Sequence, residues 1–116
     1  MISEESCIVL SGIVVCPGVV TSSVVVINDE KDINSVNQGD VVVIPKSNPI
    51  YVLALTKASG LICEIGGRLS HICTIAMEMG ITCITQVNDA TKLIKTGQIV
   101  NIDGSTGEEG FVTVYQ

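Results

Sequence analysis

His71 is the only histidine of this chain, and it follows two glycines and a serine in the stretch GGRLSH, residues 66–71. An imidazole has an unperturbed pKa of about 6.5, so near neutral pH it is largely uncharged and can act as a nucleophile. Ser70 is a good residue to start a helix, and Gly66-Gly67 lets the backbone turn sharply or approach a bound group. Unpaired amides and the positive dipole end of that helix would favour an anion beside His71. A phosphoryl group on the ring is such an anion.

Other interpretations of these residues stay open. His71 can be a surface histidine that flanks a helix cap, and Ser70 can be a plain capping residue. A metal site would need further ligands, and nothing near His71 in the sequence supplies them. A hydrolase nucleophile at Ser70 would need a base and a G-x-S-x-G turn, which the sequence lacks. Arg68 can pair with a phosphate as a charged donor or be a solvated loop cation.

The five cysteines, an odd number without a C-x-x-C pair, indicate small buried hydrophobic side chains in a reducing compartment. Cys73 differs because it falls in the first turn of the predicted helix, where a thiolate is favoured. A catalytic pair of Cys73 and His71 is disfavoured, since residues two apart on a helix point in different directions.

Length and composition narrow the class of protein. A chain of 116 residues with 47% hydrophobic content can bury one sizeable core, so we expect a single domain over residues 1–116. The net charge of -6, with lysines and arginines scattered singly, argues against nucleic-acid binding. No apolar run approaches the roughly 20 residues that span a bilayer, and the start MISEESC does not have the order of a signal peptide. We therefore expect a cytoplasmic protein that does not bind membranes.

Apolar patterns and breakers predict the secondary structure. Strands are expected at 8–15, 23–27, 41–44, 61–64, 81–85, 99–103 and 111–115, helices at 48–55 and 70–79, a helix from 89 capped by Gly97, and a polar loop or short helix at 28–40. On the 70–79 helix, a buried stripe would contain Ile72, Ile75, Ala76 and Met79. His71 falls about 90° from the centre of this stripe at about 100° per residue, so the ring is expected at the rim, within reach of solvent.

The order of these elements indicates the fold. The C-terminal half alternates strand and helix, which predicts parallel strand pairing, and the N-terminal half is mostly strand. We therefore expect an α/β domain of three layers, two of strands and one of helices.

The run ASGLICEIGGRLSHICTIAMEMGITCITQVNDAT resembles the mobile phosphohistidine domain of the phosphoenolpyruvate (PEP)-utilising enzymes, the group that includes pyruvate phosphate dikinase and PEP synthase. That family places a Gly-Gly pair, two variable residues, a Ser or Thr, and then the phosphorylated His at a helix start. Gly66, Gly67, Ser70 and His71 match in order and spacing. The likeness extends to GIVVCPGVVTSSVVV, GDVVVIPKSNP and VNIDGSTGEEGFVTV, and so to nearly the whole chain.

The resemblance implies a swivelling β/β/α domain in which His71 accepts a phosphoryl group, with Nε2 the family's usual site. Gly66, Gly67, Arg68 and Ser70 would position the phosphate. This domain would bind no cofactor or metal itself. ATP, PEP and Mg²⁺ would belong to the partners, a nucleotide-grasp kinase component and a barrel component for pyruvate and PEP, or another acceptor component.

Three departures from the family pattern bear on function. Met77 stands where the family has Arg, which removes a cation close to the expected phosphate, and Thr82 stands where it has Pro. The third departure is length: the family's domain is normally tethered on both sides, whereas this chain has almost no linker. We therefore expect a separate carrier subunit that is incomplete as an enzyme by itself. A degenerate docking or regulatory subunit is the alternative that Met77 suggests. A dehydratase small subunit, another use of swivelling domains, is disfavoured by the Gly-Gly-x-x-Ser-His run.

Overall fold

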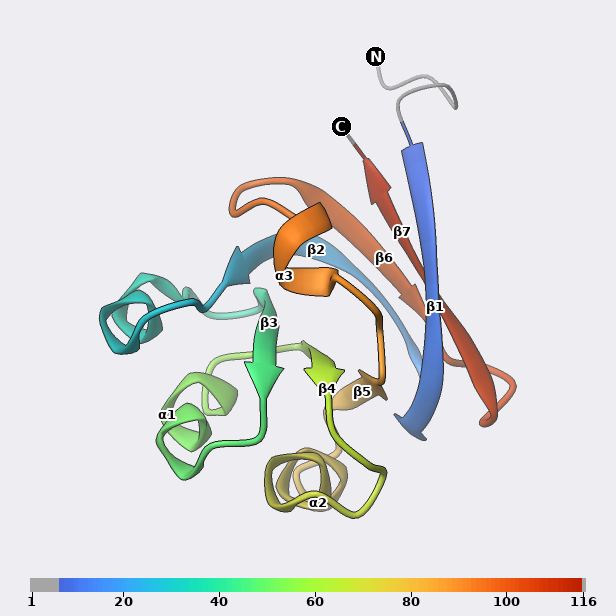
Figure 1. The fold of residues 1–116 in the computed structure, drawn as a ribbon, viewed down its shortest axis with the longest axis horizontal. Helices are drawn as coiled ribbons and strands as arrows, with labels where there is room; N and C mark the ends of the chain where they lie inside the picture. The colour runs from blue at the N-terminus through green and yellow to red at the C-terminus, as the bar shows by residue number, and fades with distance from the viewer. Residues whose placement is uncertain (1–6, 116) are drawn as a thin grey trace.

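The computed structural model describes residues 7–115, in which seven strands form one closed barrel (Figure 1). Around the barrel the strands are ordered β1-β5-β4-β3-β2-β6-β7. Their bounds are β1 Cys7–Cys16, β2 Val19–Val26, β3 Val41–Lys46, β4 Gly60–Ile65, β5 Thr82–Thr85, β6 Ile99–Asp103 and β7 Glu109–Tyr115. The helices are short: α1 Val52–Leu55, α2 His71–Glu78 and α3 Ala90–Leu93, with 3-10 turns at η2 Glu30–Ser35 and η3 Pro49–Tyr51.

The barrel has a part in which neighbouring strands are parallel and a part in which they are antiparallel. Strands β2, β3, β4 and β5 pair in parallel, and every other neighbouring pair is antiparallel. The predicted parallel pairing is confirmed for β4 and β5, where Gly60 lies opposite Thr82. It is wrong for β6, which pairs antiparallel with β2 and with β7 instead.

The predicted three-layer β/β/α fold is wrong. Strand β1 pairs with β5 on one side and with β7 on the other, so the strands form a closed sheet instead of two separate layers. A register shift between Val14 and Cys16 bends β1 where it meets β5, and such bulges are common where sheets curve. The helices have four to eight residues, too few to build a covering layer.

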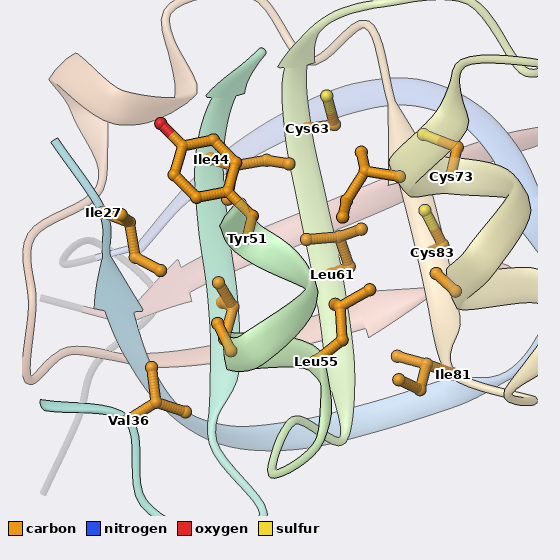
Figure 2. Close-up of a cluster of buried hydrophobic side chains, with 14 of the residues drawn as sticks. Ile27, Val36, Ile44, Tyr51, Leu55, Leu61, Cys63, Cys73, Ile81 and Cys83 are labelled. Carbon is orange, nitrogen blue, oxygen red and sulfur yellow. The ribbon is translucent and has the colours of Figure 1, made fainter. Parts of the chain in front are cut away.

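Two apolar clusters stabilise the domain, one inside the barrel and one outside. On β3 the side chains alternate: Val41 and Val43 join the inner cluster, and Val42 and Ile44 join the outer one. The outer cluster fills the space between the parallel strands and helices α1 and α2 (Figure 2). Strands buried on both faces read as continuous apolar runs, which is why 41–44 and 61–63 show no alternation.

Most predicted elements lie where the sequence placed them. The predicted helix 48–55 is a 3-10 turn followed by the single helical turn α1, and α3 ends before Ile94 without using Gly97 as its cap. Strand β3 continues through Pro45 to Lys46. Among the described residues, the longest helix, α2, has eight residues, and no helix is long and apolar enough to cross a bilayer.

Candidate functional site

His71 is the first residue of α2, and its side chain is exposed. Ile72, Cys73 and Ala76 turn inward and are fully buried. The predicted position of His71 outside the buried stripe is therefore confirmed, but the stripe itself was partly wrong. Cys73 belongs to it, and Met79, at the C-terminal end of the helix, is 47% exposed.

Only some of the backbone amides at the start of α2 donate hydrogen bonds within the chain. Ser47 Oγ accepts a hydrogen bond from the Ile72 amide at 3.2 Å, and the Ser70 carbonyl accepts from the Thr74 amide at 2.9 Å. The His71 amide donates to no acceptor within residues 7–115. An unpaired amide at a helix start attracts an anion, so the first turn of α2 presents an anion-binding group next to the exposed imidazole.

Ser70 occupies the N-cap position, as predicted, with an extended backbone (φ -61°, ψ 151°). Its side chain, however, caps no amide of α2. Ser47 already occupies the Ile72 amide that a capping hydroxyl would use. Ser70 Oγ is instead buried, makes no hydrogen bond of standard geometry with another described residue, and lies close enough to Cys73 to help lower the pKa of that thiol. Ser70 therefore shapes the start of the helix through its carbonyl and not through its hydroxyl.

The two glycines before His71 differ in whether the fold requires a glycine. Gly66 has φ +152°, a conformation that side chains rarely adopt, and its carbonyl accepts a hydrogen bond of 2.9 Å from Thr85 Oγ1. Gly67 has no such backbone constraint, and a Cβ there would meet nothing within 4 Å. The fold thus requires glycine at 66, and at 67 it leaves a bare, exposed backbone beside the histidine.

Arg68 and Leu69 are exposed at the tip of this loop. Arg68 lies between two hollows in the surface and forms no ion pair with another described residue. One hollow, of about 490 Å³, is polar and has Glu108 and Glu109 in its lining, and the other, of about 390 Å³, is lined by Val15, Arg68, Leu69 and Met77. The guanidinium is therefore available to an incoming anion.

Met77, the position at which the family pattern has Arg, lies six residues along α2 from His71. At about 1.5 Å per residue the two are separated by roughly 9 Å along the helix axis. Met77 is 47% exposed and lines the same hollow as Arg68 and Leu69. A cation at position 77 would therefore lie in this hollow, on one side of the loop. It would affect an anion bound in the hollow more than the imidazole itself.

Three thiols lie buried beneath the loop, on three different elements: Cys63 on β4, Cys73 on α2 and Cys83 on β5 (Figure 2). The predicted burial is confirmed for these three, and Cys7 and Cys16 are half-buried. Hydrogen bonding with Cys73, and burial, raise the pKa of both Cys63 and Cys83. The thiols of Cys63 and Cys83, acting as donors, lower the pKa of Cys73. Within residues 7–115 no cysteine pair forms a disulfide, and no group of three or more metal-ligating side chains could hold a metal ion.

Ser47 and Thr85 hold the site in place and were missed by the sequence analysis. Their partners, Ile72 and Gly66, lie 25 and 19 residues away along the chain. No local pattern in the sequence signals such contacts.

Comparisons with known proteins point to one family. The family model for the PEP-utilising enzyme mobile domain matches residues 36–107. Phosphoenolpyruvate synthase of Pyrococcus furiosus is 38% identical over 104 residues, and a probable phosphoenolpyruvate synthase of Pyrococcus horikoshii is 40% identical over 104 residues. Each alignment covers 90% of this chain but 13% of the relative, so the chain spans about an eighth of the length of these enzymes.

Solved structures show the same fold at lower identity. Aconitase X of Thermococcus kodakaraensis in its holo form superimposes with a TM-score of 0.67 at 16% identity, covering 94% of this chain and 99% of that one. A solution structure of an Enzyme I protein gives a TM-score of 0.57 at 24% identity, covering 71% of this chain and 33% of that one. These two likenesses concern the fold alone. The match over residues 36–107 and the identity to the synthases show that this chain belongs to the PEP-utilising enzyme mobile-domain family.

Proposed function

We propose that this chain is a phosphoryl carrier in which His71 accepts a phosphoryl group from one component of a PEP- or pyruvate-type phosphotransferase and passes it to another. The observation that carries the proposal is the exposed imidazole at the first position of α2, beside an unpaired amide and an unpaired arginine. Family membership supports a role in phosphoryl transfer, and the exposed position of the His71 ring supports this residue as the acceptor.

In the forward step, a neutral ring nitrogen of His71 forms the N–P bond as the P–O bond to the donor breaks. By analogy with the family this nitrogen is Nε2. The leaving oxygen keeps the bonding electrons, and the ring proton on the other nitrogen is lost to solvent. In this proposal the Arg68 guanidinium and the His71 amide bind the added negative charge, which the positive end of the helix also stabilises. Phosphoryl transfer needs little more from a carrier than positioning, the role that we assign to this loop.

The donor and the acceptor lie outside this chain in the proposal. A nucleotide-grasp component would supply the group from ATP and a barrel component would exchange it with pyruvate and PEP, each with Mg²⁺. The relatives' much greater length supports this arrangement, because their remaining residues can build such components. We place the carrier in the cytoplasm, where thiols stay reduced.

The test is phosphorylation by the cognate nucleotide-grasp component with Mg-ATP, or by the cognate barrel component with PEP. Wild type should gain one acid-labile phosphoryl group, and His71→Asn should gain none. Arg68→Gln should slow labelling without abolishing it, because the guanidinium orients the phosphate and the imidazole reacts with it. Equal labelling of wild type and His71→Asn, or no labelling by either donor, would contradict the proposal.

A second candidate is a docking or regulatory subunit that keeps the fold without carrying phosphate. Met77 supports it, since the hollow beside Arg68 lacks the cation that the family pattern places there. If this candidate holds, wild type stays unlabelled and Met77→Arg creates labelling. Robust labelling of wild type excludes it.

A further inference from the structure

We infer that Cys63 and Cys73 are an oxidative modification site beneath the His71 loop: a hydroperoxide joins them in a disulfide, which displaces the loop that carries the imidazole. The disulfide itself is independent of the proposed function. Its effect on phosphoryl transfer rests on that function.

The three buried thiols form one cluster. The side chains of Cys63, Cys73 and Cys83 lie next to one another in the outer apolar cluster, although the three residues come from β4, α2 and β5 (Figure 2). All three have no exposed surface and pack in the outer apolar cluster (Figure 2). A disulfide needs two sulfurs that can approach to about 2 Å without backbone distortion, and thiols that are neighbours in one buried cluster meet this condition more readily than separated ones.

Cys63 connects the cluster directly to the loop. A Cβ built on Gly66 would lie 3.6 Å from Cys63 Sγ and 3.6 Å from Ser70 Oγ, so the sulfur packs against the first glycine of the loop. The Cys63 thiol also donates to the Ile65 carbonyl at 3.3 Å. A disulfide removes this proton and leaves the Ile65 carbonyl without that donor. Moving Cys63 Sγ toward α2 therefore alters the backbone next to Gly66.

Cys73 is the expected nucleophile of the pair. It lies in the first turn of α2, where the helix dipole favours a thiolate, and its neighbours' thiols donate to it. Cys63 is the expected resolving thiol, because its hydrogen bond is the largest cause of the lowered pKa of Cys73, ahead of that of Cys83, and because it also packs against Gly66. The loop residues Gly67, Arg68 and Leu69 are exposed, whereas the thiols have no exposed surface, so the proposed oxidation requires this loop to open for a small oxidant.

The chemistry balances with a hydroperoxide as the oxidant. The Cys73 thiolate attacks one peroxide oxygen, the O–O bond breaks, and a sulfenic acid and hydroxide form, so the sulfur loses two electrons to the peroxide. The Cys63 sulfur then attacks the sulfenic sulfur, an S–S bond forms, and water leaves with the Cys63 proton. With hydrogen peroxide, two thiols and one peroxide give one disulfide and two waters. A dithiol reductant reverses the change.

The experiment uses a Cys7→Ser, Cys16→Ser background, which removes the two half-buried cysteines that would compete for oxidant. This protein is treated with hydrogen peroxide, denatured, alkylated and mapped by peptide mass spectrometry. We expect loss of two alkylatable thiols and a Cys63–Cys73 cross-link, reversed by dithiothreitol. Cys83→Ala should keep the cross-link and Cys73→Ala should lose it. A cross-link that involves Cys83, or oxidation without any cross-link, would overturn the inference.

The loop is monitored by NMR of the imidazole. His71 is the only histidine, so its ring resonances need no assignment against others. Oxidation should shift them in the Cys7→Ser, Cys16→Ser background and leave them unchanged when Cys73→Ala is added. Unchanged resonances in a protein shown to carry the cross-link would overturn the coupling to the loop. Neither readout needs a phosphoryl donor. A failure of the disulfide inference can therefore be distinguished from a failure of the carrier proposal.

Discussion

Replacing each of the two glycines before His71 by alanine should give opposite results, although the residues are adjacent. At Gly66 a Cβ has its nearest neighbours at 3.6 Å, an ordinary contact, so no steric clash is expected. The cost comes from the backbone, because φ is +152° and alanine rarely adopts this conformation. Backbone strain of this kind costs about 1–3 kcal/mol, so the free energy of unfolding of Gly66→Ala should fall by that amount.

At Gly67 alanine should cause neither a steric clash nor backbone strain. The backbone there lies outside the positive-φ region, and a Cβ meets nothing within 4 Å. Alanine restricts the unfolded chain, so Gly67→Ala should leave the free energy of unfolding unchanged or raise it by about 0.4–1 kcal/mol.

Urea unfolding followed by circular dichroism measures both values, and the Gly67 variant serves as the matched control for the Gly66 variant. On heating, the Gly66 variant should unfold at a melting temperature lower by roughly 4 °C for each kcal/mol lost, because a chain of 116 residues has an unfolding entropy of about 0.24 kcal/mol/K. Equal stability of the two variants, or a greater loss at Gly67, would refute the assignment of the backbone constraint to Gly66.

Three further predictions follow from individual contacts. Ser47→Ala removes the hydrogen-bond acceptor of the Ile72 amide, so it should lower the free energy of unfolding, measured in urea, by about 1 kcal/mol. Ser47→Thr keeps a hydroxyl and should be closer to wild type in stability; equal stability of the two variants would contradict this role. Gly12→Ala places a Cβ 2.5 Å from the Thr85 carbonyl oxygen, so it should lower the free energy of unfolding by about 3 kcal/mol or prevent folding. Soluble yield and circular dichroism measure this effect, and a variant as stable as wild type would refute the close packing. Hydrogen bonds from Ser105 lower the pKa of Asp103, so its contribution to stability is present above the unfolded-state pKa of about 3.9 and is lost as the pH falls through the lower folded-state value. Asp103→Asn should therefore reduce the acid dependence of stability below about pH 4, and an identical acid profile would argue against it.

The sequence was sufficient for those features that depend on near neighbours. Pro49 lies at the first position of a helical element after the cap Asn48, as expected, although that element is a 3-10 turn. The apolar run at 41–44 lies in a strand, and the helical wheel placed His71 on the outside of α2. The family motif brought Gly66, Gly67, Arg68, Ser70 and His71 to one loop and helix start, which is where the structure has them. Each of these inferences uses residues within one or two helical turns or one strand.

The features that the sequence did not predict depend on distant partners. Closure of the barrel needs β1 to pair with β7, for example Cys7 with Tyr115, and no local pattern encodes a pairing between the two ends of the described chain. Ser70 has the sequence of a capping residue, but Ser47, from a different segment, takes the amide that it would cap. Both outcomes are decided by tertiary contacts, which override local preference.

The central claim is that the His71 imidazole itself carries the phosphoryl group. The most direct test is fragmentation mass spectrometry of the labelled protein under conditions that preserve N–P bonds, because it locates the group on a single side chain. The account predicts the phosphoryl group on His71 and its loss after mild acid. A phosphoryl group on Ser70 or any other side chain, stable to acid, would contradict it.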